Sequence, residues 1–251
     1  MKLIPHNKPY RILRPIKLAR GTEASRLINE IIEISNGIRT YLEIGVEYGR
    51  TLEAVESKIK IAIDPKFRFN KFFKNKNTKI YEMTSDVYFH ENQCPDIDVA
   101  FLDGFHSGEQ TFKDFRNIVP GLSTKSIVII DDVFPSDFHS SLETPEKAFG
   151  SRENSGLIND FKWHGDVFNA IFAIIQHFPH LIFYTVADLS NPVTVFFNFE
   201  DSYSNNIKSL EYFVAEDNAS FLQEKDYKIP QEFNPDTKEN ILKALKRHFK
   251  N

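Results

Sequence analysis

Short apolar runs alternate with segments of helix-spaced apolar residues through the first half of the chain. An apolar run of about four to eight residues is typical of a buried strand, whereas apolar residues at i, i+3 and i+4 are typical of a helix. These patterns predict five strands, at residues 40–46, 60–64, 79–84, 97–102 and 126–130. They predict helices before, between and after the strands, at 22–35, 50–57, 67–75, 109–119 and 166–178.

This regular alternation breaks after the fifth strand. Residues 134–164 carry prolines, glycines and polar residues without a clear period. A connection of this length inside a compact domain is commonly functional, so we predict a lid or a binding loop. Beyond the helix at 166–178, the apolar runs 181–186 and 193–199 flank a turn-like sequence, which predicts an antiparallel strand pair.

Strands that alternate with helices indicate an open α/β sheet, because the crossover helices cover its two faces. We therefore predict a doubly wound, mostly parallel, seven-stranded α/β sheet of Rossmann-like type with a terminal antiparallel strand pair. One domain at residues 22–200 accounts for these elements. An N-terminal arm at 1–21 and a helical C-terminal extension at 201–251 flank it.

Composition and charge exclude several classes of protein. The 251 residues include 24 Phe and 9 Tyr, which is too much apolar area for a disordered chain. A net charge of −4 gives no reason to expect a nucleic-acid partner. The six Lys and Arg within residues 1–22 favour a solvated arm over a polyanion or membrane-surface contact. No apolar run approaches membrane-spanning length, so we expect a soluble, cytoplasmic protein without a membrane partner.

Two of the ten glycines stand in the sequence YLEIGVEYGRT, which ends the first predicted strand. In an open α/β sheet, ligands bind outside the carboxyl ends of the strands. Gly45 and Gly49 would let this turn approach a ligand closely, and Asp64 at the end of the second strand suits the hydroxyls of a ribose. The pattern is typical of a nucleoside site, although a plain strand–helix turn would use the same glycines. The third glycine of the dinucleotide fingerprint is missing, which counts against an NAD-binding oxidoreductase.

Three aspartates follow the fourth and fifth predicted strands. Asp103 ends the fourth strand, and Asp131 and Asp132 end the fifth. Neighbouring parallel strands lie about 4.8 Å apart, so the three carboxylates would crowd one edge of the sheet and repel one another. A divalent cation with oxygen ligands, such as Mg²⁺, would remove that conflict. The alternative is a metal-free cluster of helix caps and hydrated acids.

The motifs E-I-G-x-x-x-G-x-T, a strand-ending Asp, L-D-G-x-H and I-D-D, in this order, resemble those of class I S-adenosylmethionine-dependent methyltransferases. Within that class, residues 22–200 are most similar to the metal-dependent small-molecule O-methyltransferases of the macrocin and catechol types. The resemblance implies S-adenosylmethionine as cofactor. The implied cofactor residues are Glu43, Gly45 and Gly49 for the methionine and ribose, Asp64 for the ribose hydroxyls, Thr84, Ser85 and Asp86 for the adenine surroundings, and Asp103. For the three residues at 84–86, a helix N-cap is an equally good interpretation.

The resemblance also implies a reaction, the transfer of a methyl group to a hydroxyl of a small molecule or sugar. Asp103, Asp131 and Asp132 would hold a divalent metal, expected to be Mg²⁺, next to that hydroxyl. His106 in the L-D-G-x-H turn would take the hydroxyl proton, with Asp103 beside it, since a neutral imidazole is a suitable base near pH 7. His164 is an alternative base, and a structural role stays open for both histidines.

Other functions remain open at this level. A metal-independent N- or O-methyltransferase would use Asp131 or Asp132 directly on the acceptor. A methyltransferase fold without activity would act as a binding module. The apolar first helix and the charged tail leave room for a homo-oligomer.

Overall fold

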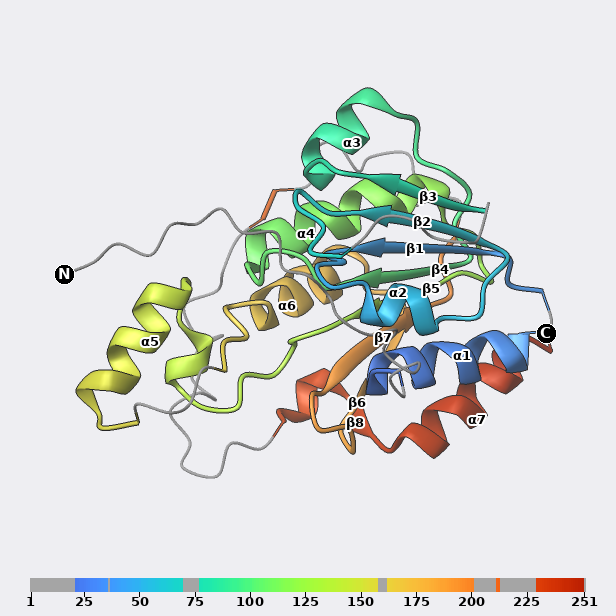
Figure 1. Cartoon of the computed structure of the whole chain (residues 1–251). Coiled ribbons are helices and arrows are strands. Elements are labelled where there is room, and N and C mark those ends of the chain that lie inside the picture. The colour runs from blue at the N-terminus through green and yellow to red at the C-terminus, as the bar shows by residue number, and fades with distance from the viewer. Residues whose placement is uncertain are drawn as a thin grey trace.

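The structure is a computed structural model, and it describes residues 21–35, 37–69, 77–157, 162–200, 211–212 and 229–250. Nearly all of the predicted N-terminal arm and most of the first half of the predicted C-terminal extension lie outside these residues. The predicted fold class is confirmed, because the described residues form one mostly parallel sheet with helices on both faces (Figure 1).

The sheet has the strand order β3-β2-β1-β4-β5-β7-β6-β8. Strands β1 to β5 pair in parallel, and β7 pairs antiparallel with both β5 and β6. The strands are β1 Thr40–Ile44, β2 Ile59–Ile63, β3 Thr78–Tyr81, β4 Val99–Leu102, β5 Ile127–Ile130, β6 Ile182–Val186, β7 Val193–Phe197 and β8 Pro235–Asp236. The strand order reverses direction between β1 and β4, and a ligand site is expected at the carboxyl ends beside this switch.

Two helical layers cover the sheet. The helices are α1 Glu23–Ser35, α2 Arg50–Ala54, α3 Ser85–Glu91, α4 Gly108–Ile118, α5 Pro145–Asn154, α6 Phe168–His177 and α7 Lys238–His248. One apolar cluster joins α3, α4 and α6 to one face of the sheet, and a second joins α1, α2 and α7 to the other. Successive strand side chains point to opposite faces, so in β1 Leu42 packs in the first cluster and Tyr41 in the second. Burial on both faces explains the continuous apolar runs in the sequence.

Within the described residues the sheet contains eight strands, so the predicted count of seven is wrong. The eighth strand, β8, consists of Pro235 and Asp236 and pairs with β6 at the edge. The Ala187 N–H donates to the Asp236 carbonyl at 3.0 Å. Two residues are too few to give an alternating pattern, and a proline is ordinarily a sign against a strand.

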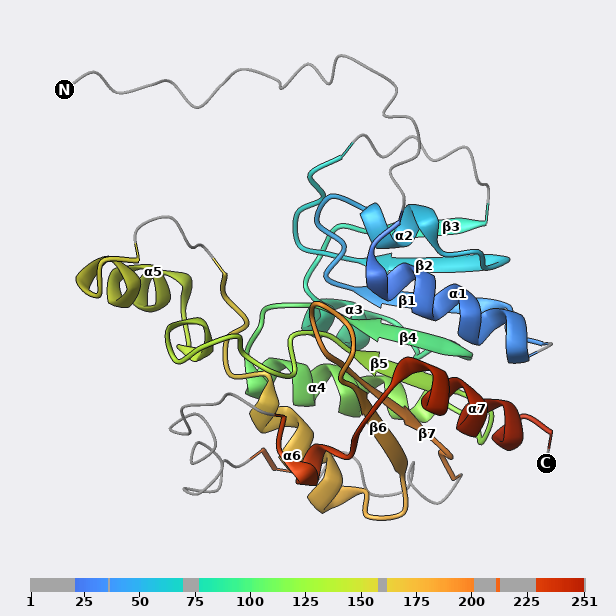
Figure 2. The ribbon, with the colours of Figure 1, turned by 90° about the horizontal axis from the view of Figure 1, so that it is seen from below.

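The segment 134–164, predicted as a loop without regular structure, contains helix α5. This helix lies beyond the carboxyl ends of the parallel strands in both views, away from the sheet (Figures 1 and 2). Its buried residues are Ala148 and Arg152, so its sequence has no helix-spaced row of apolar residues from which the helix could be predicted. The predicted helix at 67–75 is wrong at residues 67–69, which are irregular, and the rest of it is outside the described residues. No helix among the described residues is long and apolar enough to cross a membrane.

Candidate active site

A cavity of about 730 Å³ opens at the carboxyl ends of β1 to β4. Segments that follow these four strands form most of its wall, together with Thr22, Trp163 and the first half of α4. Of the predicted cofactor residues, all except Gly49 line the cavity. The tertiary structure therefore brings together residues that the sequence spreads over 61 positions, from Glu43 to Asp103.

The turn after β1 depends on its two glycines. Gly45 has φ +84°, and a Cβ there would lie 1.7 Å from the carbonyl oxygen of Asp103. Gly49 has φ +69°, and a Cβ there would lie 2.8 Å from the ring of Phe69. Both positions therefore need a residue without a side chain, for backbone conformation as well as for space. The turn is held close to the end of β4, where the second part of the site begins.

Asp64 fixes this turn from the end of β2. One carboxylate oxygen accepts the backbone N–H groups of Val46 at 2.8 Å and Glu47 at 2.9 Å, and the other accepts that of Lys66 at 2.7 Å. An ionised carboxylate has about four acceptor sites, so these bonds leave capacity for a further donor. Asp64 also lines the cavity, which places that capacity within reach of a ligand hydroxyl.

Glu43 is a buried acid at the floor of the cavity, with 1% of its surface exposed. The Tyr41 hydroxyl donates to its Oε2 at 2.6 Å. Burial raises the pKa of Glu43 to about 8, although the Tyr41 hydrogen bond and the charge of Lys60 act in the opposite direction. A cationic ligand group would lower this pKa, because it stabilises the ionised carboxylate.

Thr84, Ser85 and Asp86 form the start of α3 and also line the cavity. The Thr84 hydroxyl oxygen accepts the backbone N–H of Val87 at 3.3 Å, so the N-cap interpretation is confirmed for Thr84. Capping does not remove these residues from the cavity wall, and their hydroxyl and carboxyl groups remain available to a ligand.

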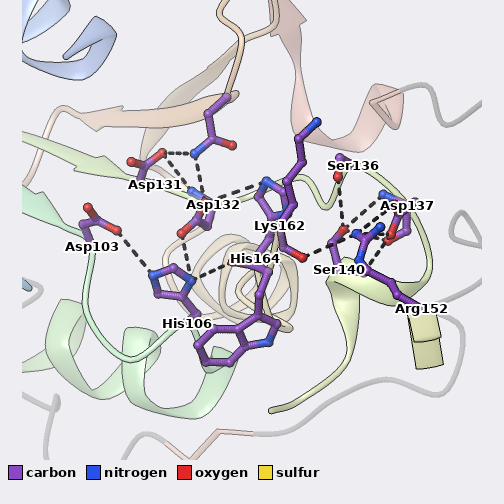
Figure 3. A network of polar contacts seen from close by, with 12 residues as sticks. Asp103, His106, Asp131, Asp132, Ser136, Asp137, Ser140, Arg152, Lys162 and His164 are labelled. Carbon is purple, nitrogen blue, oxygen red and sulfur yellow. Dashed lines mark hydrogen bonds and ion pairs between the residues drawn. The ribbon is translucent and has the colours of Figure 1, made fainter. Parts of the chain in front are cut away.

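Three residues after β4 and β5 converge next to the cavity (Figure 3). Asp103 and His106 line the cavity, and Asp132 lies behind them. Asp103, His106 and Asp132 each present one ligand atom, and these atoms all lie within 4.8 Å of one another. Of the three predicted metal residues, Asp103 and Asp132 belong to this group. Asp131 points to Asn191, whose amide Nδ2 donates to Asp131 Oδ1 at 2.8 Å and to Asp132 Oδ1 at 2.9 Å.

The acidic groups at this end are short of positive charge. Desolvation, followed by the charges of Asp131 and Asp132, raises the pKa of Asp103 well above its ordinary value. Desolvation and the charge of Asp132 raise the pKa of Asp131 to about 8. The repulsion expected from the strand-end positions is therefore present, and a cation bound here would relieve it.

His106 is held on three sides. Its Nδ1 lies 3.0 Å from Asp132 Oδ2 and 3.1 Å from the carbonyl oxygen of Trp163. Its ring stacks on the Trp163 indole, with centroids 4.9 Å apart and planes at 16°. His106 has φ +52° and Asp132 has φ +57°, a left-handed conformation that is uncommon outside glycine and is often found at functional sites. Both residues of the His106–Asp132 contact therefore have an unusual backbone conformation.

His164, the alternative base, lies on the other oxygen of Asp132, with Nε2 4.0 Å from Oδ1. It does not belong to the cavity wall. Burial lowers the pKa of His164, and its Nδ1 has no hydrogen-bond partner among the described residues. The backbone N–H groups of His164 and Gly165 both donate to the Ser140 carbonyl, which ties this segment to the loop after β5.

Comparison with known proteins agrees with this layout. Residues 42–133, which run from β1 to the end of the Asp131–Asp132 turn, match the family model described as a methyltransferase domain. The predicted resemblance to class I S-adenosylmethionine-dependent methyltransferases is confirmed by the match. No curated protein sequence matches the chain.

Several solved structures are similar to part of the chain. A protein assigned as a caffeoyl-CoA O-methyltransferase from Staphylococcus aureus is 17% identical, with a TM-score of 0.47, over 70% of this chain and 82% of that one. The O-methyltransferase TomG from Streptomyces achromogenes, solved with S-adenosylmethionine, is 11% identical, with a TM-score of 0.47, over 72% and 82%. An O-methyltransferase from Bacillus cereus, solved with S-adenosylhomocysteine, is 10% identical, with a TM-score of 0.45, over 75% and 84%.

The sequence patterns missed several residues of this site. Asn191 comes from the turn between β6 and β7, and nothing in its sequence surroundings links it to Asp131. Gln110 and Asp114 line the cavity from α4. Asp114 could have been noticed in the sequence, because an acidic residue is unusual on the apolar helix face that Phe112, Phe115 and Ile118 form.

Proposed function

We propose that this methyltransferase transfers the methyl group of S-adenosylmethionine to a hydroxyl of a small molecule or sugar, with a divalent metal, expected to be Mg²⁺, beside that hydroxyl. The contact between His106 and Asp132 carries the proposal, since it couples a proton acceptor to an acidic group at the edge of the cavity. A cytoplasmic location and a homo-oligomer remain predictions.

The cavity suits S-adenosylmethionine in volume and in donor set. Its volume of about 730 Å³ is within the range of roughly 300–1,000 Å³ that is common for small-molecule sites. Asp64 would accept from the ribose hydroxyls, and Glu43 would face the ammonium group of the methionine part. When bound, the cofactor supplies a methyl group on a positively charged sulfur, which is the electrophile of the reaction.

The acidic residues after β4 and β5 suit a divalent cation. Asp103 and Asp132 already bring ligand atoms close together, and Asp131 would complete an oxygen set of the kind that Mg²⁺ prefers. The raised pKa values of Asp103 and Asp131 support this assignment, because burial and the neighbouring acids disfavour their charged forms and a bound cation would favour them. A metal bound there would lower the pKa of the acceptor hydroxyl.

His106 is the proposed base, and its surroundings select the tautomer. The Asp132 carboxylate and the Trp163 carbonyl are both acceptors within hydrogen-bond distance of Nδ1, whereas Asp103 Oδ1 lies 3.6 Å from Nε2, which is too far for a good hydrogen bond. This arrangement favours the hydrogen on Nδ1 and leaves the lone pair on Nε2. Nε2 would take the proton from the acceptor hydroxyl, and Asp132 would stabilise the imidazolium that forms. His164 is assigned a supporting role behind Asp132, because it does not line the cavity.

Calorimetry and a turnover assay test the proposal. S-adenosylhomocysteine should bind and NAD should not; the absence of sulfur-nucleoside binding would overturn the proposed function. Methyl transfer from S-adenosylmethionine to a panel of sugars and phenols, followed by mass spectrometry, should require Mg²⁺ and fall at least a hundredfold in His106→Asn. His90→Ala, at an exposed position on α3, is the matched control. Turnover that survives both chelation and Asp131→Ala would indicate a metal-independent enzyme.

A further inference from the structure

Asp114, a residue of helix α4, is a buried acid that lines the cavity. Only 2% of its surface is exposed, yet it belongs to the cavity wall. Its Oδ2 lies below the turn after β4, 3.4 Å from where a Cβ on Gly104 would be. The glycine thus leaves room between the turn and the carboxyl group.

Asp114 belongs to a cluster in which three oxygens lie near one amide nitrogen, that of Gln110. Gln110 Nε2 lies 3.0 Å from Asp114 Oδ1, 3.3 Å from Ser85 Oγ and 3.2 Å from Asp86 Oδ1. An amide nitrogen has two N–H groups, so it cannot donate to three oxygens at once. Ser85 also donates to Asp114, so the Asp114 carboxylate accepts bonds from two side chains and, with about four acceptor sites, has capacity for N–H groups of a ligand.

The charge of the cluster favours the same kind of ligand. Burial raises the pKa of Asp114 to about 7, although hydrogen bonds from Ser85 and Gln110 act against the rise. The nearby charge of Asp86 adds to the rise, and Lys113 is the cation that acts against it. A ligand with hydrogen-bond donors would stabilise the ionised carboxylate without adding a further acceptor.

The position of the cluster identifies the part of the ligand that it meets. The methionine part of the cofactor is assigned to Glu43 and Gly45, and the ribose to Asp64. Because β3 lies on the far side of β2 from β1, the space next to the start of α3 is the base end of the cavity.

We infer that Asp114 is the specificity-determining residue for the cofactor base, accepting a hydrogen bond from the exocyclic amino group of adenine. The inference rests on the proposed use of S-adenosylmethionine. Adenine presents N–H donors at its amino group, whereas a deaminated base presents a carbonyl oxygen there. At a pH above 7, the pKa to which burial raises this group, Asp114 is ionised. A carboxylate accepts hydrogen bonds only, so at such a pH the oxygen of the deaminated base would face Asp114 unpaired.

The experiment compares two ligands by calorimetry at a pH above 7, where Asp114 is ionised: S-adenosylhomocysteine and its deaminated analogue S-inosylhomocysteine. Wild type should bind the adenosyl compound at least about tenfold more tightly, because a hydrogen bond to a charged group contributes about 1.5–3 kcal/mol. Asp114→Asn should reduce that ratio at least tenfold, since its amide can donate to the base oxygen. Glu109→Gln, an exposed acid of the same helix, should leave the ratio unchanged.

Each outcome decides a different point. Equal binding of the two ligands by wild type overturns the inference even if no variant folds. A ratio that changes in Asp86→Asn and not in Asp114→Asn also overturns it, by moving the recognition to the start of α3. If wild type binds neither ligand, the proposed function fails together with the inference; if S-adenosylhomocysteine binds without discrimination, only the inference fails.

Discussion

The imidazole of His106 stacks on the indole of Trp163, while its Nδ1 lies 3.1 Å from the carbonyl oxygen of the same residue. Trp163 is the one tryptophan of the chain. A single fluorophore therefore rests against the proposed base, next to Asp132 and within a few ångströms of the candidate metal group. Its emission should report on what binds there.

Titration with Mn²⁺ should quench the emission of Trp163 in a saturable way. Mn²⁺ accepts the same oxygen ligands as Mg²⁺, and its paramagnetism makes it a quencher. Asp132→Asn removes a proposed ligand charge and should weaken the apparent affinity tenfold or more. His90→Ala, remote on the sequence and exposed, should titrate like wild type. An unchanged titration in Asp132→Asn would exclude Asp132 as a ligand.

Gly45→Ala should destabilise the protein severely. A side chain there would have φ +84° and a Cβ 1.7 Å from a backbone oxygen, which cannot move aside as a flexible side chain could. We expect a loss of at least about 3 kcal/mol in the free energy of unfolding, measured in urea, and no binding of S-adenosylhomocysteine.

The matched control is Gly150→Ala, in helix α5. A Cβ at Gly150 would meet nothing within 4 Å, and alanine is the better helix former. This variant should gain about 0.5–1 kcal/mol. Equal stability of Gly45→Ala and wild type would mean that the β1 turn does not lie against β4 as described.

Asp114 should make the stability depend on pH. The folded state raises the pKa of this acid from its ordinary 3.8 to about 7, so it favours the protonated form. The stabilisation is fully present below about pH 4 and is lost as the pH rises through 7. The free energy of unfolding of Asp114→Asn minus that of wild type should therefore increase between pH 4 and pH 8, by at most about 4 kcal/mol.

Urea unfolding at several pH values measures this difference. Glu109→Gln alters an exposed acid of the same helix and should follow the wild-type curve at constant offset. If the free energy of unfolding depended on pH in the same way in Asp114→Asn and in wild type, the pKa of Asp114 would not be raised in the folded state, and the prediction would be wrong.

Arg152 anchors helix α5 to the loop after β5. Its side chain is 1% exposed, and Nη2 lies 2.9 Å from each carboxylate oxygen of Asp137. Removal of one partner leaves the other without its counter-charge, so Arg152→Met should cost about 3 kcal/mol, at the low end for a buried pair because Asp137 is 30% exposed. The double variant Arg152→Met/Asp137→Asn should recover part of that loss.

The measurement is a double-mutant cycle in urea, together with the Trp163 emission spectrum. The Ser140 carbonyl accepts the backbone N–H of His164, and the Ser140 N–H donates to Asp137 Oδ1 at 2.8 Å. A loosened Asp137 should therefore also change the environment of Trp163. An additive cycle would show that the two side chains do not interact in solution.

Local sequence patterns were sufficient to predict features that depend on a single strand or turn. The strands β1, β2, β4 and β5 were predicted because burial on both faces leaves a continuous apolar run. Gly45 and Gly49 were predicted because a turn that follows a strand needs special backbone angles. Helix α5 and strand β8 were missed because they bury too little of their own surface to leave a period.

By itself, the sequence determined the alternating sheet and helices, the glycine turn and the strand ends where acids would gather. Tertiary structure alone decided which side chains meet. His106 contacts Trp163, 57 positions away, and Asp131 is bonded to Asn191, 60 positions away. Such contacts depend on how whole elements pack over the sheet, and the free energy that fixes them comes from apolar burial spread over many residues. No spacing along the chain encodes them, whereas a strand or a turn is specified by neighbours a few residues apart.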